Sequence, residues 1–383
     1  MKESRAGTFV KQPAGYMAFI PKPLPPTPPL EYDSELRFAL SEADRAVAKL
    51  GVLTEFLPNP DLFIAMYVKK EALLSSQIEG TEASLEGVLE FEADLKPKDN
   101  IDEIKEVINY IKAMNYGMEK VKRSHISLEL IKEMHRVLIQ GTRGSRRGLG
   151  EFRRSQNWVG PPGAALLDAT FVPPPPDIVV VAMTELEQFV HAENETPPLV
   201  KAGLIHAQFE TIHPFLDGNG RIGRLLITLY LFREKILSKP LLYLSFYLKK
   251  ERTQYYDLLM RIRTEGAWED WVSFFFRGIT ETSEEAVRAA RDIIALKDSI
   301  ISRLHENRVS SIHAVRLIDL LFDTPLTSVP AVAEKLAVSK QTAHGIVTKF
   351  NEMGILKEIT GKERYRKYLF EDYVRIIAKG TEL

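Results

Sequence analysis

Apolar residues recur every three or four positions over most of the chain, which is the spacing of one face of an α-helix. Between residues 101 and 121, for example, Ile104, Val107, Ile108 and Ile111 share one face. The pattern predicts a mainly α-helical fold with helices over 34–53, 62–80, 101–121, 127–139, 179–192, 198–213, 223–237, 244–266 and 267–306. We expect the hydroxyls of Ser34 and Ser127 to cap the first and fourth of these helices.

Two segments interrupt the helical pattern. Residues 20–30 contain six prolines, which remove backbone donors and favour an extended polyproline arm. Residues 141–177 are rich in glycine, proline and arginine, and within them 155–160 and 169–174 have the composition of two short strands around a turn. We therefore expect a proline-rich N-terminal arm and, between the fourth and fifth helices, a small β-hairpin.

The C-terminal part of the chain has a different pattern. Residues 329–356 have the small-residue turn and apolar spacing of a helix-turn-helix, and two short strands are expected around the basic stretch 360–368, TGKERYRKY. This order predicts a winged helix-turn-helix. DNA would meet the start of its second helix and the basic wing, whereas protein contact or dimerisation is the alternative use of such a module. The helix-start residues are Ser339, Lys340, Gln341, Thr342 and His344.

Composition limits the classes of function. The chain has 383 residues, 45% of them hydrophobic and 27% charged, which is typical of a soluble globular protein of more than one domain. The net charge of −1 gives no global attraction for nucleic acid or a membrane surface. The absence of cysteine excludes disulfides, thiolate metal sites and thiol catalysis, and it fits a reducing, cytoplasmic location. No secretory signal or membrane-spanning run is visible.

Residues 213–224, HPFLDGNGRIGR, concentrate polar and glycine residues between two helices. Pro214 stops the first helix, and free N–H groups at the start of the second, near Gly218 and Gly220, form a cradle for an anion. Arg221 and Arg224 share a helix face and suit a polyphosphate. A carboxylate within such a cationic site indicates Mg²⁺ bridging Asp217 to phosphates.

Three further residues complete the physical interpretation of this loop. His213 is a base that can accept the proton of a hydroxyl nucleophile at neutral pH. Asn219 can cap the second helix or donate its amide to an oxyanion, and Phe215 is expected to turn inward and pin the loop.

The same twelve residues resemble the signature of the Fic (filamentation induced by cAMP) domain family, HPFx(D/E)GN(G/K)RxxR, at every position. The resemblance implies a helical enzyme that moves AMP from ATP to a hydroxyl of a target protein or of itself and releases pyrophosphate. It makes His213 the general base, Asp217 the Mg²⁺ ligand and Asn219 a contact of the α-phosphate. Gly218 to Gly220 would hold phosphates through their backbone, Arg221 would contact the triphosphate, and Arg224 its γ-phosphate.

The resemblance extends on both sides of the motif. QNWVG at 156–160 and ATFVPPPP at 169–176 are similar to the family's flap hairpin, which pairs with the target segment as an added strand. LKKERTQYYDLL is similar to the segment beside the adenine, which implies nucleotide contacts for Tyr255 and Tyr256; tyrosines at helical spacing also occur in cores. The expected divisions are an arm over 1–33, a helical region over 34–120, the Fic core over 121–280, a connecting helix over 281–306 and the winged helix over 307–383.

SSQIEG, residues 75–80, resembles the family's inhibitory pattern (S/T)xxxE(G/N), with Ser75 and Glu79 at its fixed positions. A carboxylate paired with Arg224 would occupy the guanidinium that the γ-phosphate of ATP needs, and it would repel the triphosphate. The resemblance thus implies an enzyme inhibited within its own chain.

Two alternatives to AMP transfer stay open at the level of sequence. A Fic enzyme can also remove AMP from its target, alone or in addition to adding it. A protein of another class, a DNA-binding regulator that senses ATP, would use the same nucleotide site without catalysis. The family further implies a homodimer.

Overall fold

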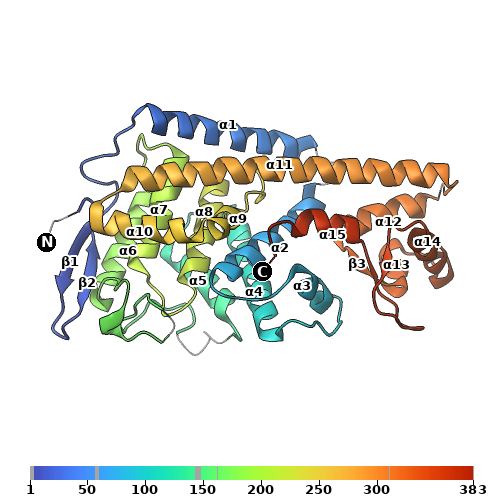
Figure 1. Ribbon diagram of the computed structural model, residues 1–383, viewed down its shortest axis with the longest axis horizontal. Helices are drawn as coiled ribbons and strands as arrows, with labels where there is room; N and C mark the ends of the chain where they lie inside the picture. The colour runs from blue at the N-terminus through green and yellow to red at the C-terminus, as the bar shows by residue number, and fades with distance from the viewer. Residues whose placement is uncertain (1–3, 57–59, 143–147, 162, 310, 383) are drawn as a thin grey trace.

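The computed structural model describes residues 4–56, 60–142, 148–161, 163–309 and 311–382. Helices make up most of it, and α11 (Trp268–Glu306) lies along nearly the whole long axis of the molecule (Figure 1). The helix α1 (Ser34–Phe56) lies alongside α11. The mainly α-helical class predicted from the apolar spacing is confirmed.

A helical bundle below these two helices contains the predicted motif. Its helices are α2 (Pro60–Ile78), α4 (Ile101–Val121), α5 (Leu128–Ile139), α7 (Pro198–Ile212) and α8 (Asn219–Arg233). The helices α7 and α8 pack on each other and are buried on nearly all sides, including polar side chains such as Glu210 and Arg224. The outer elements are α3 (Leu85–Glu92), the 3₁₀ turn η2 (Leu166–Asp168), α6 (Pro176–His191), α9 (Ser245–Lys250) and α10 (Arg252–Glu265).

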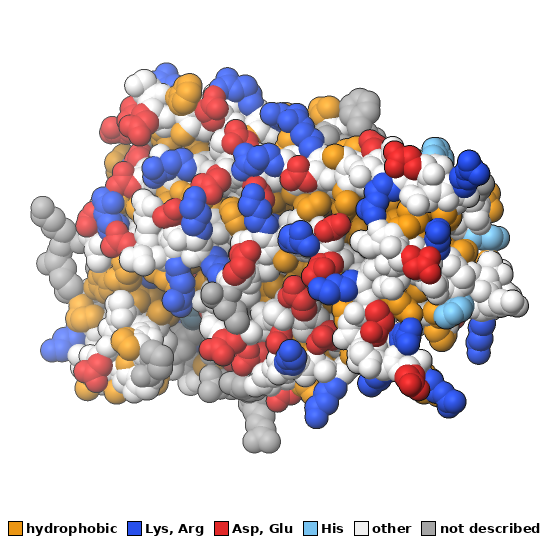
Figure 2. All heavy atoms as spheres, turned by 45° about the vertical axis from the view of Figure 1, so that its right-hand side comes forward, with side chains coloured by type: hydrophobic (Ala, Val, Ile, Leu, Met, Phe, Trp, Pro, Cys, Tyr) orange, Lys and Arg blue, Asp and Glu red, His pale blue; other side chains and the backbone are white. Residues whose placement is uncertain are grey.

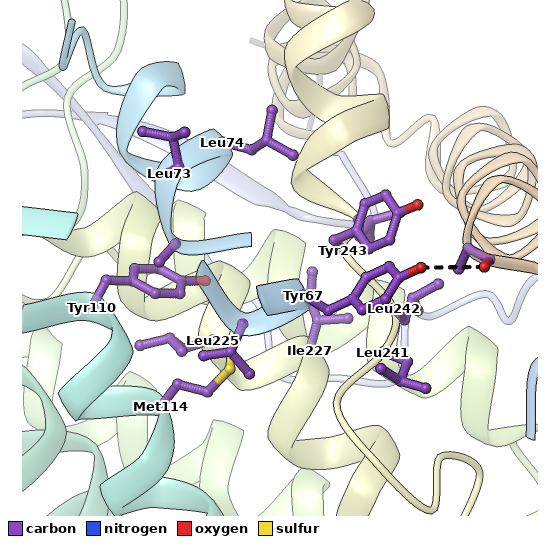
Figure 3. Packing of buried hydrophobic residues seen from close by; sticks show 14 of the residues in the cluster. Tyr67, Leu73, Leu74, Tyr110, Met114, Leu225, Ile227, Leu241, Leu242 and Tyr243 are labelled. Atoms are coloured by element: carbon purple, nitrogen blue, oxygen red, sulfur yellow. Dashed lines mark hydrogen bonds between the residues drawn. The ribbon is translucent and has the colours of Figure 1, made fainter. Parts of the chain in front are cut away.

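The helix α2 is anchored in the hydrophobic core of this bundle. Figure 3 shows Leu73 and Leu74 of α2 near Tyr110 of α4, Leu225 of α8 and the segment 241–243. All of these side chains are almost completely buried. Burial of a leucine contributes about 1.5–3 kcal/mol, so the position of α2 against α4 and α8 is strongly fixed.

The C-terminal domain is a winged helix-turn-helix. Its helices are α12 (Ile312–Asp323), α13 (Val329–Leu336), α14 (Lys340–Glu352) and α15 (Glu371–Ala378), and a three-stranded antiparallel sheet has the order β3 (Leu326–Thr327), β5 (Tyr368–Leu369), β4 (Lys357–Glu358). Ser339 caps α14 by accepting a hydrogen bond from the Thr342 N–H. On the face shown in Figure 2, positive and negative side chains are interspersed, in agreement with the near-zero net charge.

Four expectations about local structure need correction. The first cap is Asp33, whose Oδ1 accepts from the Leu36 N–H at 2.8 Å, and Ser34 is already inside α1. The N-terminal arm contains a hairpin, β1 (Gly7–Lys11) paired with β2 (Met17–Pro21), and the first proline of the stretch 20–30 is the last residue of β2. The flap has one bridge, between Val159 and Phe171, in place of two strands. The expected division at residue 280 falls inside the continuous helix α11.

Candidate functional site

The motif loop joins the C-terminus of α7 to the N-terminus of α8. His213 follows α7 in the left-handed conformation (φ 50°), and its N–H donates to the Phe209 carbonyl at 2.9 Å. Pro214 then directs the chain away from the helix axis. Gly218, also left-handed (φ 77°), precedes α8, so the first N–H groups of α8 open toward the loop with no side-chain cap. This is the geometry of an anion cradle.

Asn219 braces the loop from inside. Its Oδ1 accepts from the Phe215 N–H and its Nδ2 donates to the Phe215 carbonyl, both at 2.8 Å. The side chain is almost fully buried. The cap expected from Asn219 is therefore absent among the described residues, and the structure gives this amide a bracing position in which one N–H is already used.

The ring of Phe215 fixes the loop to the bundle. It is fully buried and stacks on His135 of α5, with ring centroids 3.7 Å apart and planes 6° from parallel. His135 Nε2 donates to the Asp217 carbonyl at 3.0 Å, while its Nδ1 accepts from the Gly150 N–H. Sequence reasoning missed His135, because a histidine on an apolar helix face gives no signal of its partner.

Arg153 and Asn157 hold the loop from the flap side, and both were also missed. Arg153 is buried, its Nε donates to the His213 carbonyl at 2.9 Å, and its guanidinium also reaches the Pro174 carbonyl at 2.5 Å. Asn157 Nδ2 donates to the Phe215 carbonyl at 2.8 Å. These partners are backbone carbonyls between 21 and 60 residues away, so no side-chain pattern could reveal them.

His213 is held where it can act as a base. Its side chain is 20% exposed although Nδ1 is buried, so the exposure belongs to the rest of the ring. Burial, with the cations Arg263 and Arg153 nearby, lowers the pKa of His213 to about 4. The imidazole is therefore neutral at pH 7 and free to accept a proton.

Arg224 is buried on α8 and faces the end of α2. Its Nε donates to Ser75 Oγ and its terminal nitrogen to the Ser75 carbonyl, both at 2.8 Å, and the same nitrogen donates to Glu79 Oε1 at 2.7 Å. Although burial opposes ionisation, the charge and hydrogen bond of Arg224 lower the pKa of Glu79. The two residues thus form an ion pair at neutral pH.

The Glu79 carboxylate lies against the first turn of α8. A Cβ built on Gly220 would be 2.1 Å from Glu79 Oε1, so the carboxylate approaches this backbone at a distance that only glycine permits. An internal anion therefore occupies the helix N-terminus that the motif prepares for an anion.

Behind Arg224 lies a second, fully buried acid. Glu71 accepts hydrogen bonds from Tyr110 Oη at 3.1 Å, from Ser245 Oγ at 2.5 Å and from the Ser245 N–H at 3.2 Å. Burial raises the pKa of Glu71 to about 7, although these hydrogen bonds and Arg224 act in the opposite direction. Tyr110 is one of the residues that surround α2 in Figure 3.

Arg221 joins the motif to α4. Its guanidinium lies 3.3 Å from Glu106 and 3.5 Å from Asp217, whose side chain is about one-third exposed. Within the described residues, no group of three or more His, Asp or Glu side chains could hold a metal by itself. A pocket of about 240 Å³ beside Asp217 is lined by Glu79, Gly80, Thr81, Glu103, Glu106, Asp217, Gly218 and Arg221.

The two tyrosines proposed for the adenine side have different environments. Tyr255 is fully buried, and its hydroxyl forms a 2.9 Å hydrogen bond with His206. Packing in the core explains this environment of Tyr255, whose burial leaves no surface for a nucleotide. Tyr256 is 37% exposed, with Arg252 5.5 Å from its ring. Only Tyr256 is accessible to a ligand.

Comparison with known families agrees with the fold and the loop geometry. Residues 38–119 match the family described as Fic/DOC family N-terminal, and residues 125–231 match the Fic/DOC family. These two matches show a Fic/DOC N-terminal region and a Fic/DOC domain within the chain. Residues 315–368 match a family described as HTH DNA binding domain. The predicted Fic fold with a C-terminal helix-turn-helix is confirmed.

Curated relatives carry the name protein adenylyltransferase Fic. The protein of Drosophila mojavensis is 33% identical over 236 residues, which cover 59% of this chain and 43% of the relative. That of Drosophila virilis is 31% identical over 252 residues, covering 63% and 48%. The chain thus spans less than half the length of these relatives.

Solved structures show the same fold. A Fic family protein from Desulfovibrio desulfuricans G20 aligns with a TM-score of 0.60 at 21% identity, covering 89% of this chain and 97% of that one. A Fic domain containing signaling protein from Bacteroides thetaiotaomicron aligns with a TM-score of 0.51 at 17% identity, covering 67% and 97%. Among the described helices, none is long and apolar enough to cross a membrane.

Proposed function

We propose that the protein is an ATP- and Mg²⁺-dependent protein adenylyltransferase that is inhibited by its own Glu79. The observation that supports this most directly is the position of the Glu79 carboxylate, 2.7 Å from Arg224 and against the N-terminus of α8. The names of the curated relatives supply the reaction class.

The reaction joins AMP to a hydroxyl oxygen of a target protein. That oxygen attacks the α-phosphorus of ATP, the bond from the α-phosphorus to the bridging oxygen breaks, and pyrophosphate leaves. His213 takes the hydroxyl proton. The Gly218–Gly220 backbone, Arg221 and Arg224 hold the triphosphate and neutralise its charge, so positioning and electrostatics supply most of the catalysis.

Asp217 fits the proposed Mg²⁺ site. A protein site for Mg²⁺ in nucleotide enzymes commonly offers one or two carboxylates, with phosphate oxygens and water completing the coordination. Asp217 is partly exposed at the α8 N-terminus and offers one such carboxylate. The ion would offset negative charge on the phosphates when bound.

Glu79 inhibits because it competes for Arg224. A buried guanidinium needs an anionic partner, and either the carboxylate or the γ-phosphate can fill that place. While Glu79 is paired, ATP lacks this contact and meets a like charge at the cradle. Loss of Glu79 frees Arg224 and removes the repulsion.

The first test is intact mass after incubation with ATP and Mg²⁺, for wild type, Glu79→Gly and Glu79→Gly/His213→Ala. We expect AMP-sized mass additions of about 329 Da on Glu79→Gly alone, through self-modification. If none appears, the assay is repeated with cell lysate as the target. Absence of transfer there contradicts the proposal.

Removal of AMP is a second activity to be tested at the same site. Wild type is incubated with the adenylylated product of the Glu79→Gly variant, and loss of the AMP mass would identify an enzyme that works in both directions. No loss would leave transfer as the sole activity.

The helix-turn-helix match favours DNA as a further partner. Lys340 to His344 begin α14 and are largely exposed, as a groove-reading helix requires. Binding to duplex DNA should weaken steeply with salt. If DNA binding depends on ATP and no protein receives AMP, the ATP-sensing regulator replaces the transferase. Size-exclusion chromatography with light scattering tests the expected homodimer.

A further inference from the structure

A buried acid lies beside the base and has no function in the reaction described above. Glu210 is on the last turn of α7, three residues before His213, and is only 7% exposed. Its Oε1 is buried without a hydrogen-bond partner among the described residues. Because an unpartnered buried carboxylate is costly, its retention calls for a physical reason.

The fold leaves room for this carboxylate at a cost in helix stability. Gly223 lies in the interior of α8, and a Cβ at this position would be 2.3 Å from Glu210 Oε1. Glycine inside a helix is destabilising by roughly 0.5–1 kcal/mol relative to alanine. The space next to Glu210 therefore exists only because α8 carries glycine at this point.

The nearest group that could use the carboxylate is the base. Glu210 Oε2 lies 3.9 Å from His213 Nδ1, which is buried, faces the Glu210 backbone carbonyl and forms no well-aligned hydrogen bond with a described residue. The backbone carbonyl of Glu210 accepts from Arg263 at 3.2 Å. Catalytic hydrogen bonds are often long without substrate and shorten in the complex, so this pair is positioned to close.

Charge around the base explains why an anion is needed there. Arg263 on α10 and Arg153 both oppose a positive charge on His213, whereas Glu79, which the active Glu79→Gly background lacks, and the Glu210 backbone carbonyl favour it. Glu210 is faced by Arg224 on α8, by Arg263 and Tyr255 on α10, and by Glu79 at the end of α2. When His213 accepts the target's proton, the new cation stands among arginines, and a carboxylate at Nδ1 offsets it.

We propose that Glu210 is a positioning residue for His213: its carboxylate accepts the Nδ1–H, turns the other ring nitrogen to the target hydroxyl, and stabilises the imidazolium. The proton taken from the hydroxyl stays on the ring, and the Nδ1 proton stays on Nδ1. This inference rests on the proposed AMP transfer, in which His213 is the base.

The test compares Glu210→Gln and Glu210→Ala in the active Glu79→Gly background at pH 8. At that pH the carboxylate is ionised, since burial raises the pKa of Glu210 only to about 7. We expect kcat to fall at least tenfold in both variants. The loss should not exceed the ~10²–10⁴-fold that a positioned base contributes in total. The KM for ATP should stay unchanged or fall, because loss of Glu210 removes a negative charge that faces Arg224.

A structural function alone would not change the protonation of the ring. Removal of the anion should move the acidic limb of the kcat–pH profile to lower pH, because the imidazolium loses its counter-charge. In ¹⁵N-histidine spectra at pH 8, His213 should carry its proton on Nδ1 in the parent protein and on Nε2 in Glu210→Ala. Glu234→Gln, an exposed acid at the other end of α8, is the matched control and should leave all three readouts unchanged.

Gly223→Ala gives an independent variant, because its Cβ displaces the carboxylate while the charge is kept; it should lower kcat as Glu210→Ala does. Unchanged kcat in both Glu210 variants, or a lower kcat with the acidic limb and the tautomer unchanged, would overturn the proposal. If the Glu79→Gly parent itself transfers no AMP, the proposed function has failed, and the tautomer measurement still decides whether Glu210 holds His213.

Discussion

Arg224 is a buried cation that contacts Ser75 and Glu79. Ser75 satisfies it from one side, while Glu79 supplies the negative charge that burial makes necessary. In the proposed mechanism a phosphate, which is also an anion, replaces the carboxylate. In the proposed mechanism, activation is an exchange of anions around a fixed guanidinium.

Ser75 fixes the Arg224 guanidinium, and the next residue, Ser76, provides a matched control. Ser75→Ala should lower the free energy of unfolding by about 1.5–3 kcal/mol, because Arg224 Nε loses a charge-assisted hydrogen bond in a buried place. Ser76 is equally buried, and its hydroxyl has no partner among the described residues. Ser76→Ala should therefore cost nothing. Urea unfolding of both variants measures the difference, and equal losses would contradict the assignment.

Glu71 gives the stability a defined pH dependence. Its folded pKa of about 7 exceeds the ordinary value of 4.5, so the folded state binds more protons than the unfolded state between these pH values. Stability from this group is therefore present below pH 4.5 and falls as pH rises toward 7. Glu71→Gln should gain on wild type between pH 5 and pH 8, by up to about 3 kcal/mol.

Urea unfolding at both pH values measures this gain. The exposed Glu86 provides the control, since Glu86→Gln should keep a constant difference from wild type. A constant difference for Glu71→Gln as well would mean that its carboxyl is ionised throughout this range.

At the scale of elements, apolar spacing predicts what local sequence determines. The helix 101–121 was predicted with the bounds of α4, and Ser127 caps α5 as expected. The hairpin β1–β2 was missed, because one of its strands leads into prolines and its stability comes from packing: Phe19 is fully buried, and its N–H donates to the Val172 carbonyl. Such tertiary contacts override local preference.

The candidate site likewise contains some residues that local sequence reveals and others that only the fold reveals. The motif loop could be located from the sequence, since its glycines, proline and charged residues each answer a local requirement. The residues that hold it were not found, because Arg153, Asn157 and His135 act on backbone groups far along the chain. Asn219 was placed correctly in the loop, but its amide turns inward, a choice that depends on the Phe215 backbone.

Arg153 tests how much the flap segment contributes to the loop. Arg153→Lys keeps the charge but loses the planar fork that reaches the His213 and Pro174 carbonyls together. In the Glu79→Gly background we expect a loss in kcat of tenfold or more with little change in the KM for ATP, because the cradle on α8 stays intact. The exposed neighbour Arg154→Lys should have no effect. Equal kinetics for both would show that the flap does not position the base.

At the scale of the whole molecule, α11 carries the chain away from the site and the C-terminal domain returns to it. Lys367 of the wing donates to the Ala93 carbonyl at the end of α3 at 2.8 Å. The last described residues lie beside α2: Gln77 Nε2 donates to the Thr381 carbonyl at 2.9 Å, and Lys249 Nζ bridges Gln77 and the Glu382 carbonyl. Figure 1 shows the C-terminus near α2.

These contacts place the C-terminal tail against Gln77, which precedes Glu79 by two residues in the chain. Gln77 also donates to the Ala83 carbonyl, so it connects the two sides of the turn that carries Glu79. Gly380 fits closely against Phe246, where a Cβ would lie 2.3 Å from the ring. The tail thus contacts the end of α2, and we expect these contacts to contribute to the free energy that keeps Glu79 on Arg224.

Truncation after Ala378 should accordingly raise AMP transfer by the otherwise wild-type protein, because the turn that presents Glu79 opens more often. The increase should stay below that of Glu79→Gly, since the ion pair itself remains. Gly380→Val, which expels the tail by steric clash, should act in the same direction. Adding either change to Glu79→Gly should give no further increase, because no inhibition is left to relieve. An increase in the Glu79→Gly background would instead mean that the tail restrains catalysis by a route independent of Glu79. No increase in the wild-type background would show that the core contacts of α2 hold Glu79 without help from the tail.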